Sequence, residues 1–290
     1  MSQVNKKAPS ATWRHPVWSS AQKSCVGTAL RGSKLWFTTG RGIVTEVFYP
    51  RIDIPQIRDL GFIIADDQGF WQELKALPEP QLELDDPRVP LPIIRHHHER
   101  FDFIMRICAD PERDVLLIDF ELKGDNALRP YLLCSARLGE DAENNRAWVS
   151  DWEGRRVLWA EQGPFGLALV CRNADGYPAL ERCGVGEVGA SDLWQDFHQN
   201  GRMCWEYQEA GPGEVALAGT VTAAGNAGLG PRHQQRSGRH QCLERSGGRF
   251  REIRVGVYQR LASLAQNASP APQPGLEAAG CRQDALCTFH

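Results

Sequence analysis

Short runs of alternating apolar and polar residues, each closed by turn residues, recur along most of this chain and constrain its fold more than any other feature. Residues 35–39 form one such run and stop at a Gly-Arg-Gly turn, and residues 43–49 form the next and stop at Pro50. A period of two is typical of half-buried strands, and runs spaced by 8–12 residues with few helices are typical of a sandwich or barrel. About fifteen such runs fit two large sheets packed face to face. The sequence therefore predicts an all-β, two-sheet antiparallel sandwich.

Local patterns predict a few elements individually. Residues 101–108 and 114–122 flank a turn and are expected to form a hairpin, with Ile118, Phe120 and Leu122 on its buried face. Residues 202–207 and 214–221 are expected to continue the strand pattern. Helical signals are few, and the segment 191–198 predicts one or two turns with Ser191 as the N-cap.

The composition changes near Asn226. All nine tryptophans lie at or before Trp205, and no lysine follows Asn226, whereas arginine, glycine and proline are frequent there. Such a segment buries too little apolar surface to offset the entropy lost on ordering. We therefore expect an N-terminal arm at 1–20, a sandwich domain at 21–225 and a poorly ordered tail at 226–290. Two explanations of the tail remain open: a natural disordered basic tail, or translation of a GC-rich gene in the wrong frame.

Charge and hydropathy narrow the class of protein. The net charge of −3 lacks the basic footprint of a nucleic-acid binder, so no nucleic-acid partner is expected. No apolar run is long enough for a membrane span, and no apolar segment follows Lys6 and Lys7 as a secretion signal would require. We expect a cytoplasmic protein without a membrane partner. The nine cysteines form no CxxC pair, and Cys108, Cys134, Cys171 and Cys204 are expected to be reduced and buried in strands.

Motifs of catalysis, metal binding and cofactor binding are weak throughout. His96, His97 and His98 are consecutive, but only two of them can share a strand face, so we expect an exposed polar strand end and no metal site. The glycines at 184–189 resemble a dinucleotide loop without its following helix and are expected to connect strands. No nucleophile elbow is found, and a carboxylate pair cannot be defined by sequence spacing. We predict no catalytic residue and no cofactor.

Three blocks that are rich in both aromatic and charged residues provide the candidate binding residues. An aromatic ring stacks on the apolar face of a sugar, while an adjacent carboxylate accepts hydrogen bonds from hydroxyls. The alternative is that the rings fill cores and the charges pair to hold loops. The substrate-binding candidates are Trp152, Trp194, Asp192 and Asp196, and the structural or interface candidates are Tyr49, Arg51, Asp53, Arg58 and Asp59.

Several blocks in a fixed order resemble the N-terminal domain of bacterial glucoamylases and glucodextranases, of the glycoside hydrolase family 15 type. The resemblance covers roughly residues 18–225. The blocks are VGTA at 26–29, LWFT at 35–38, GIVTEVFYPRID at 42–53, RDLGFI at 58–63, ADPERDVL at 109–116, SDLWQD at 191–196 and GEVALAG at 213–219.

The resemblance implies a supersandwich of the galactose mutarotase type that does no chemistry itself. In such enzymes it precedes an (α/α)6 barrel, which carries two catalytic glutamates and hydrolyses terminal α-glucosidic bonds with inversion. The family pattern adds a final apolar strand, a helix and a linker after Val221, where this chain is expected to enter its tail. We therefore expect an inactive accessory domain whose partners are that barrel, missing from this chain, and an α-glucan. A free-standing carbohydrate-binding module and a mutarotase-like epimerase with a His–Glu pair are the alternatives.

Overall fold

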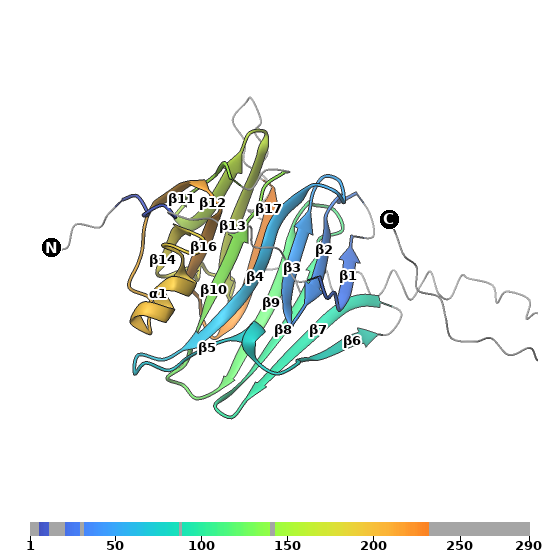
Figure 1. The fold of residues 1–290 in the computed structure, drawn as a ribbon. Coiled ribbons are helices and arrows are strands. Elements are labelled where there is room, and N and C mark those ends of the chain that lie inside the picture. The colour runs from blue at the N-terminus through green and yellow to red at the C-terminus, as the bar shows by residue number, and fades with distance from the viewer. Residues whose placement is uncertain (1–5, 12–20, 30–31, 87–88, 140–142, 232–290) are drawn as a thin grey trace, which may run out of the picture.

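Two antiparallel sheets packed face to face form the protein (Figure 1). The computed structural model describes residues 6–11, 21–29, 32–86, 89–139 and 143–231. Both the all-β class and the two-sheet sandwich are confirmed. No helix among these residues is long and apolar enough to cross a membrane.

The first sheet has eight strands in the order β1-β2-β3-β4-β10-β16-β14, and β5 pairs with β4 outside this path. Its strands are β1 (Cys25–Thr28), β2 (Trp36–Gly40), β3 (Ile43–Phe48), β4 (Pro55–Ala65), β5 (Trp71–Glu73), β10 (Arg129–Ala136), β14 (Cys183–Glu187) and β16 (Val215–Thr220). A 3-10 turn, η1 (Leu74–Ala76), follows β5.

The second sheet has nine strands in the order β15-β11-β12-β13-β17-β9-β8-β7-β6. Its strands are β6 (Gln81–Asp86), β7 (Val89–His98), β8 (Phe101–Ala109), β9 (Leu116–Gly124), β11 (Asn145–Trp152), β12 (Arg155–Gln162), β13 (Phe165–Asn173), β15 (Glu209–Gly213) and β17 (Ala224–Pro231). The hairpin expected at 101–122 is confirmed as β8 and β9.

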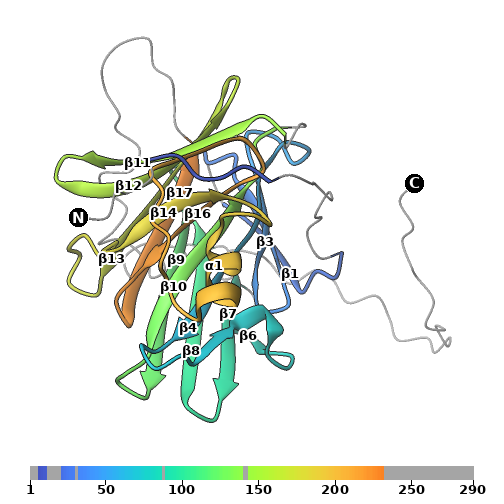
Figure 2. The same cartoon turned by 60° about the vertical axis from the view of Figure 1, so that its left-hand side comes forward.

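The main core lies between the sheets, and a second core lies outside the first sheet. Phe62 of β4 contacts Phe103 and Phe120 of the second sheet, with ring centroids 4.8 and 5.1 Å apart. The other face of β4 carries Ile63, which packs under helix α1 (Leu193–Asn200). Because β4 is covered on both faces, its second half, residues 60–65, is an unbroken apolar run and not an alternating one. Figure 2 shows α1 as the third layer, on the outside of the first sheet.

Strand β17 lies in the middle of the second sheet, between β13 and β9. The domain boundary expected after residue 225 falls inside this strand, so the sandwich extends to Pro231. The strand is rich in glycine because its neighbours come close: a Cβ on Gly225 would lie 2.2 Å from the carbonyl oxygen of Arg172. This is the final strand that the sequence was expected to lack. The rest of the expected tail, residues 232–290, lies outside the described residues.

The N-terminal segment, residues 6–11, is built into the sandwich. Its Ala8 is buried in the main core, and the Ala8 N–H donates to the carbonyl of Glu209 at 2.8 Å. The carboxylate of Glu187 accepts hydrogen bonds from the hydroxyl of Ser10 and the N–H of Ala11, at 2.9 and 3.0 Å. At least this part of the expected arm is therefore part of the fold, and residues 12–20 lie outside the described residues.

Other local expectations need correction. Residues 202–207 form no strand, and Cys204 is exposed there, whereas Cys108, Cys134 and Cys171 are buried as expected. The glycines at 184–186 lie within a strand, β14, and not in a connection; a Cβ on Gly186 would lie 2.1 Å from the carbonyl oxygen of Ser191.

Candidate functional site

The start of helix α1 is fixed by an aspartate cap. The Asp192 carboxylate accepts hydrogen bonds from the N–H of Gln195, at 2.9 Å, and from the N–H of Gly189. Burial raises the pKa of Asp192, and these backbone hydrogen bonds oppose that shift. The N-cap is therefore Asp192 and not Ser191, the preceding residue, which was expected from the sequence. The Ser191 hydroxyl instead donates to the Pro9 carbonyl at 2.7 Å.

The end of the helix is fixed by a second carboxylate. Asp196 has no exposed surface and accepts from the side chain of Asn200 at 2.7 Å and from the N–H groups of Cys204 and Trp205 at 2.6 and 2.7 Å. It therefore holds the loop that follows the left-handed C-cap, Gly201. Both candidate acids thus support the helix and its loop from within.

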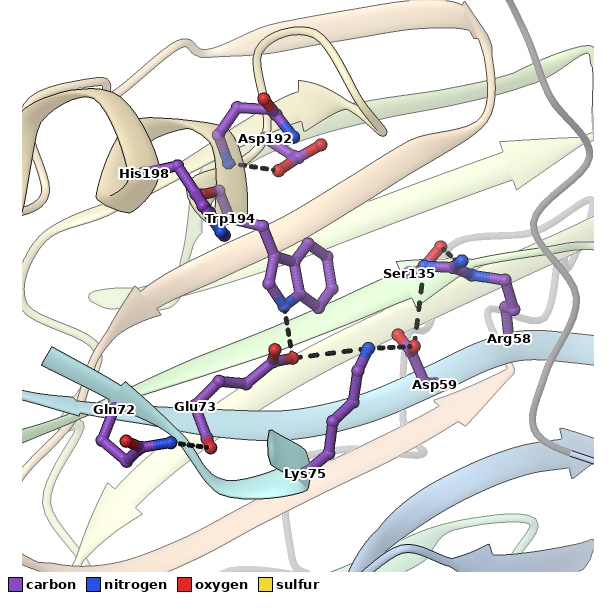
Figure 3. Close-up of polar contacts among 10 residues, drawn as sticks. Arg58, Asp59, Gln72, Glu73, Lys75, Ser135, Asp192, Trp194 and His198 are labelled. Atoms are coloured by element: carbon purple, nitrogen blue, oxygen red, sulfur yellow. Dashed lines mark hydrogen bonds and ion pairs between the residues drawn. The ribbon is translucent and has the colours of Figure 1, made fainter. Parts of the chain in front are cut away.

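A chain of polar contacts, here called the α1 network, runs from the helix to the sheet (Figure 3). The indole N–H of Trp194 donates to Glu73 at 2.7 Å, and the Lys75 ammonium lies 3.4 Å from the same carboxylate oxygen. The ammonium also lies 3.3 Å from Asp59 and 5.4 Å from the centre of the Trp194 ring. The Trp194 ring therefore has a cation over it and a carboxylate at its edge.

The α1 network ends in a buried ion pair on β4. The Nη2 atom of Arg58 lies 3.6 Å from a carboxylate oxygen of Asp59, and the Nε–H of Arg58 donates to the Ser135 hydroxyl at 3.3 Å. Consecutive strand residues normally point to opposite faces, but the register with β10 skips Arg58, as in a β-bulge, so the two side chains can meet. Two cations face two carboxylates in the α1 network, which leaves it without net charge.

The other structural candidates form local contacts. Arg51 forms an exposed ion pair with Asp53 in the loop between β3 and β4, with Nε at 3.0 Å from one carboxylate oxygen. The carbonyl of Tyr49 accepts from the Gln56 side chain at 2.9 Å. The expected pairing within these loops is therefore present, at a place separate from the α1 network.

The two candidate tryptophans pack against different sheets. Trp152 is at the end of β11 and packs with Trp148 against the cluster of Val157, Trp159 and Ala168 on the second sheet. Trp194 packs against the cluster outside the first sheet. The structure does not bring the two rings together into one binding platform.

The histidine triplet is split between three environments. His96 is buried and its Nε2 lies 2.9 Å from the Gly42 carbonyl, which corrects the expectation of an exposed strand end. His97 is exposed and contacts Asp102 at 2.7 Å, and His98 stacks on Phe101. Among the described residues, no group of three or more His, Cys, Asp and Glu side chains could hold a metal ion.

Sequence reasoning missed Glu73 and Lys75, the centre of the α1 network. Both follow Trp71 in a short strand and turn, where the polar residues look like an ordinary exposed loop. The one available signal was the alternation of charges at 73 and 75 beside a tryptophan. Their partner Trp194 lies 121 positions away from Glu73, a distance that local patterns cannot bridge.

Comparison with known proteins gives consistent matches. The family model described as glucodextranase, domain N, matches residues 8–231. A glucoamylase from Clostridium sp. (strain G0005) is 26% identical over 214 residues, which are 71% of this chain and 30% of the relative. A crystal structure of a bacterial glucoamylase complexed with acarbose superposes with a TM-score of 0.81 at 20% identity, covering 90% of this chain and 40% of that one. The chain thus spans about a third of the length of the curated relative.

Proposed function

Because the chain belongs to the glucodextranase domain N family, we propose that its sandwich is the non-catalytic N-terminal domain of a glucoamylase-type glycosidase and supports an (α/α)6 catalytic barrel. The observation that carries the proposal is the extent of the family match, which takes in both sheets and α1 and begins within the N-terminal segment. The matched unit is therefore a whole sandwich and not a fragment of one.

The side chains of the described residues favour a supporting role over chemistry. Asp192 and Asp196 flank Trp194 in the sequence, and both accept backbone N–H groups in the interior of the fold. A glycosidase needs one acid and one base that face the same glycosidic bond. Carboxylates that are buried and already accept hydrogen bonds from backbone N–H groups cannot take those roles.

The four described histidines give no support to a mutarotase-like epimerase. Their polar partners are the Gly42 carbonyl, Asp102, the Arg100 N–H and the Trp194 carbonyl. An acid–base pair of histidine and glutamate would need a glutamate beside one of them. Within the described part of the chain, no glutamate occupies that position.

Two measurements test the proposed function. The purified 290-residue chain should release no glucose from maltooligosaccharides, and release above a buffer control would refute a non-catalytic role. When mixed with a separately produced catalytic barrel of a glucoamylase-type relative, the chain should raise the recovery of active barrel after dilution from urea. The Asp196→Ala variant, with its α1 region disrupted, is the matched control and should raise recovery less. Equal recovery with and without the chain would contradict support.

A further inference from the structure

A pocket of about 340 Å³ lies at the C-terminal end of α1, away from the α1 network. Its walls come from the turn after β4, from β10, from the segment before β14 and from the loop after the helix. The lining residues are Asp67, Tyr131, Arg182, Arg202, Met203 and Cys204. A volume of this order lies in the range of sites for small molecules.

Tyr131 places a hydroxyl at the wall of the pocket. The residue is only 5% exposed, and its ring packs edge-on against Phe197 with centroids 5.0 Å apart. The side chain lines the pocket, and its hydroxyl is not among the fully buried polar atoms that lack a partner in the described part of the chain, so it opens to the pocket. A tyrosine hydroxyl that opens to a pocket can form hydrogen bonds with a ligand there. Burial raises the pKa of Tyr131, so the hydroxyl keeps its proton and can both donate and accept.

The side chains around the pocket carry charges of both signs. Arg182 is already paired, since its Nε lies 2.8 Å from Glu206. Arg202 and Asp67 have no ion-pair partner within the described part of the chain and line the pocket with opposite charges. The carboxylates of Asp67 and Glu206 offset the two guanidinium groups that line the pocket, which disfavours a strongly charged anion.

The chemistry of these groups suits hydroxyls. A carboxylate only accepts hydrogen bonds, a guanidinium only donates them, and a ligand hydroxyl can do both. Asp67, Arg202 and Tyr131 therefore offer one acceptor, one donor and one group of either kind to neighbouring hydroxyls. The loop that forms one wall of the pocket is held in place, because the Asp196 carboxylate accepts hydrogen bonds from the N–H groups of Cys204 and Trp205. A wall that is fixed before binding lowers the entropy lost on binding.

We propose that this pocket binds one neutral sugar unit, free or at the end of a short chain, through Tyr131, Asp67 and Arg202. The inference is independent of the supporting role, since a domain can stabilise a barrel without a sugar pocket. It also places the sugar contact away from Trp194, whose ring has the Lys75 ammonium over it at 5.4 Å.

The test uses glucose and maltose as probes of the full chain in ligand-observed NMR titrations. Saturable binding in the millimolar range is expected. Tyr131→Phe removes only the hydroxyl and should weaken binding roughly three- to tenfold, as the loss of one net hydrogen bond implies. Arg202→Gln and Asp67→Asn should weaken it at least as much. Arg51→Gln, in an exposed ion pair away from the pocket, is the matched control and should leave it unchanged.

Three results would overturn the proposal. One is the absence of saturable binding of either sugar. Another is binding that the three pocket variants leave unchanged, which would place the sugar elsewhere. The third is tighter binding of inorganic phosphate than of either sugar, abolished by Arg202→Gln, which would make this an anion site. If Tyr131→Phe fails to fold, as urea unfolding would show, the variants at the more exposed Arg202 and Asp67 decide.

Discussion

The polar groups around α1 are of two kinds, and they differ in what they bond. Asp196 and Glu187 are buried carboxylates that accept hydrogen bonds from the backbone of irregular segments, the loop after α1 and the N-terminal segment. Asp59 and Glu73 instead meet the cation of Lys75, whose side chain is one-third exposed. Buried acceptors of backbone donors are expensive to remove, whereas partly exposed ion pairs contribute little. The first kind should therefore contribute most to the free energy of unfolding, and the second kind should contribute little to it.

The largest effect is expected from Asp196→Ala. The change leaves two backbone N–H groups and one amide donor without their acceptor, at roughly 1–3 kcal/mol for each buried donor. We expect a loss of about 3 kcal/mol or more in the free energy of unfolding, measured by urea titration. Asp53→Asn, in an exposed loop, is the control and should change it by about 0.5 kcal/mol at most. Equal losses in the two variants would remove the distinction between the two kinds of polar group.

The next effect is expected from Glu187→Gln. The amide oxygen can still accept from the Ala11 N–H and the amide NH2 can donate to the Ser10 hydroxyl, but both hydrogen bonds lose the charge of the carboxylate. A loss of about 2 kcal/mol is expected, as for hydrogen bonds to a charged group. Hydrogen exchange should show faster exchange at the Ala8 amide, which bonds to Glu209. Ser10→Ala should have a smaller effect because the Ala11 contact remains, and unchanged exchange in Glu187→Gln would show that the segment is held by packing alone.

What could be predicted from the sequence depended on whether the determining contacts were local. The strands with alternating residues and the β8–β9 hairpin follow from short-range patterns, and so does a helix near residue 191. Strand β17 could not be recognised, because its glycines have low strand propensity in isolation. Their place in the sheet is set by the close approach of Arg172 on β13 and of Asp114 in the turn between β8 and β9.

The candidate site shows the same limit. Trp194, Asp192 and Asp196 were singled out, with Trp152, as candidates for binding substrate, but the contacts that they form depend partly on residues far along the chain. Glu73 is the clearest case, since only the folded sheet brings it under the helix. Tyr131 looked like an ordinary strand residue, and only the structure shows that its hydroxyl opens to the pocket.

When the pH is lowered, protonation of the buried His96 should reduce stability before protonation of either kind of carboxylate does. Burial lowers the pKa of His96, and the Gly42 carbonyl opposes the shift. As the pH falls below about 6.5, His96 takes up a proton in the unfolded chain before it does so in the folded chain. The stability that is present above about pH 6.5 is therefore lost as the pH falls toward the pKa of His96 in the folded chain. The urea midpoint should therefore drop between about pH 7.5 and pH 5.5. His96→Gln should flatten the drop and His97→Gln, at an exposed site, should not; a drop unchanged in His96→Gln would assign it to other groups.

The smallest effect is expected from Lys75→Gln. The change removes contacts of 3.3 and 3.4 Å to Asp59 and Glu73, but Arg58 still faces Asp59 at 3.6 Å. Because Lys75 is partly exposed, we expect a loss of about 1 kcal/mol or less, measured by urea unfolding at low salt and reduced further at high salt. Lys123→Gln removes a more exposed pair with Glu121 and should cost less still. A loss of more than about 2 kcal/mol would mean that Asp59 behaves as an uncompensated buried charge, and the α1 network would then belong with the buried carboxylates.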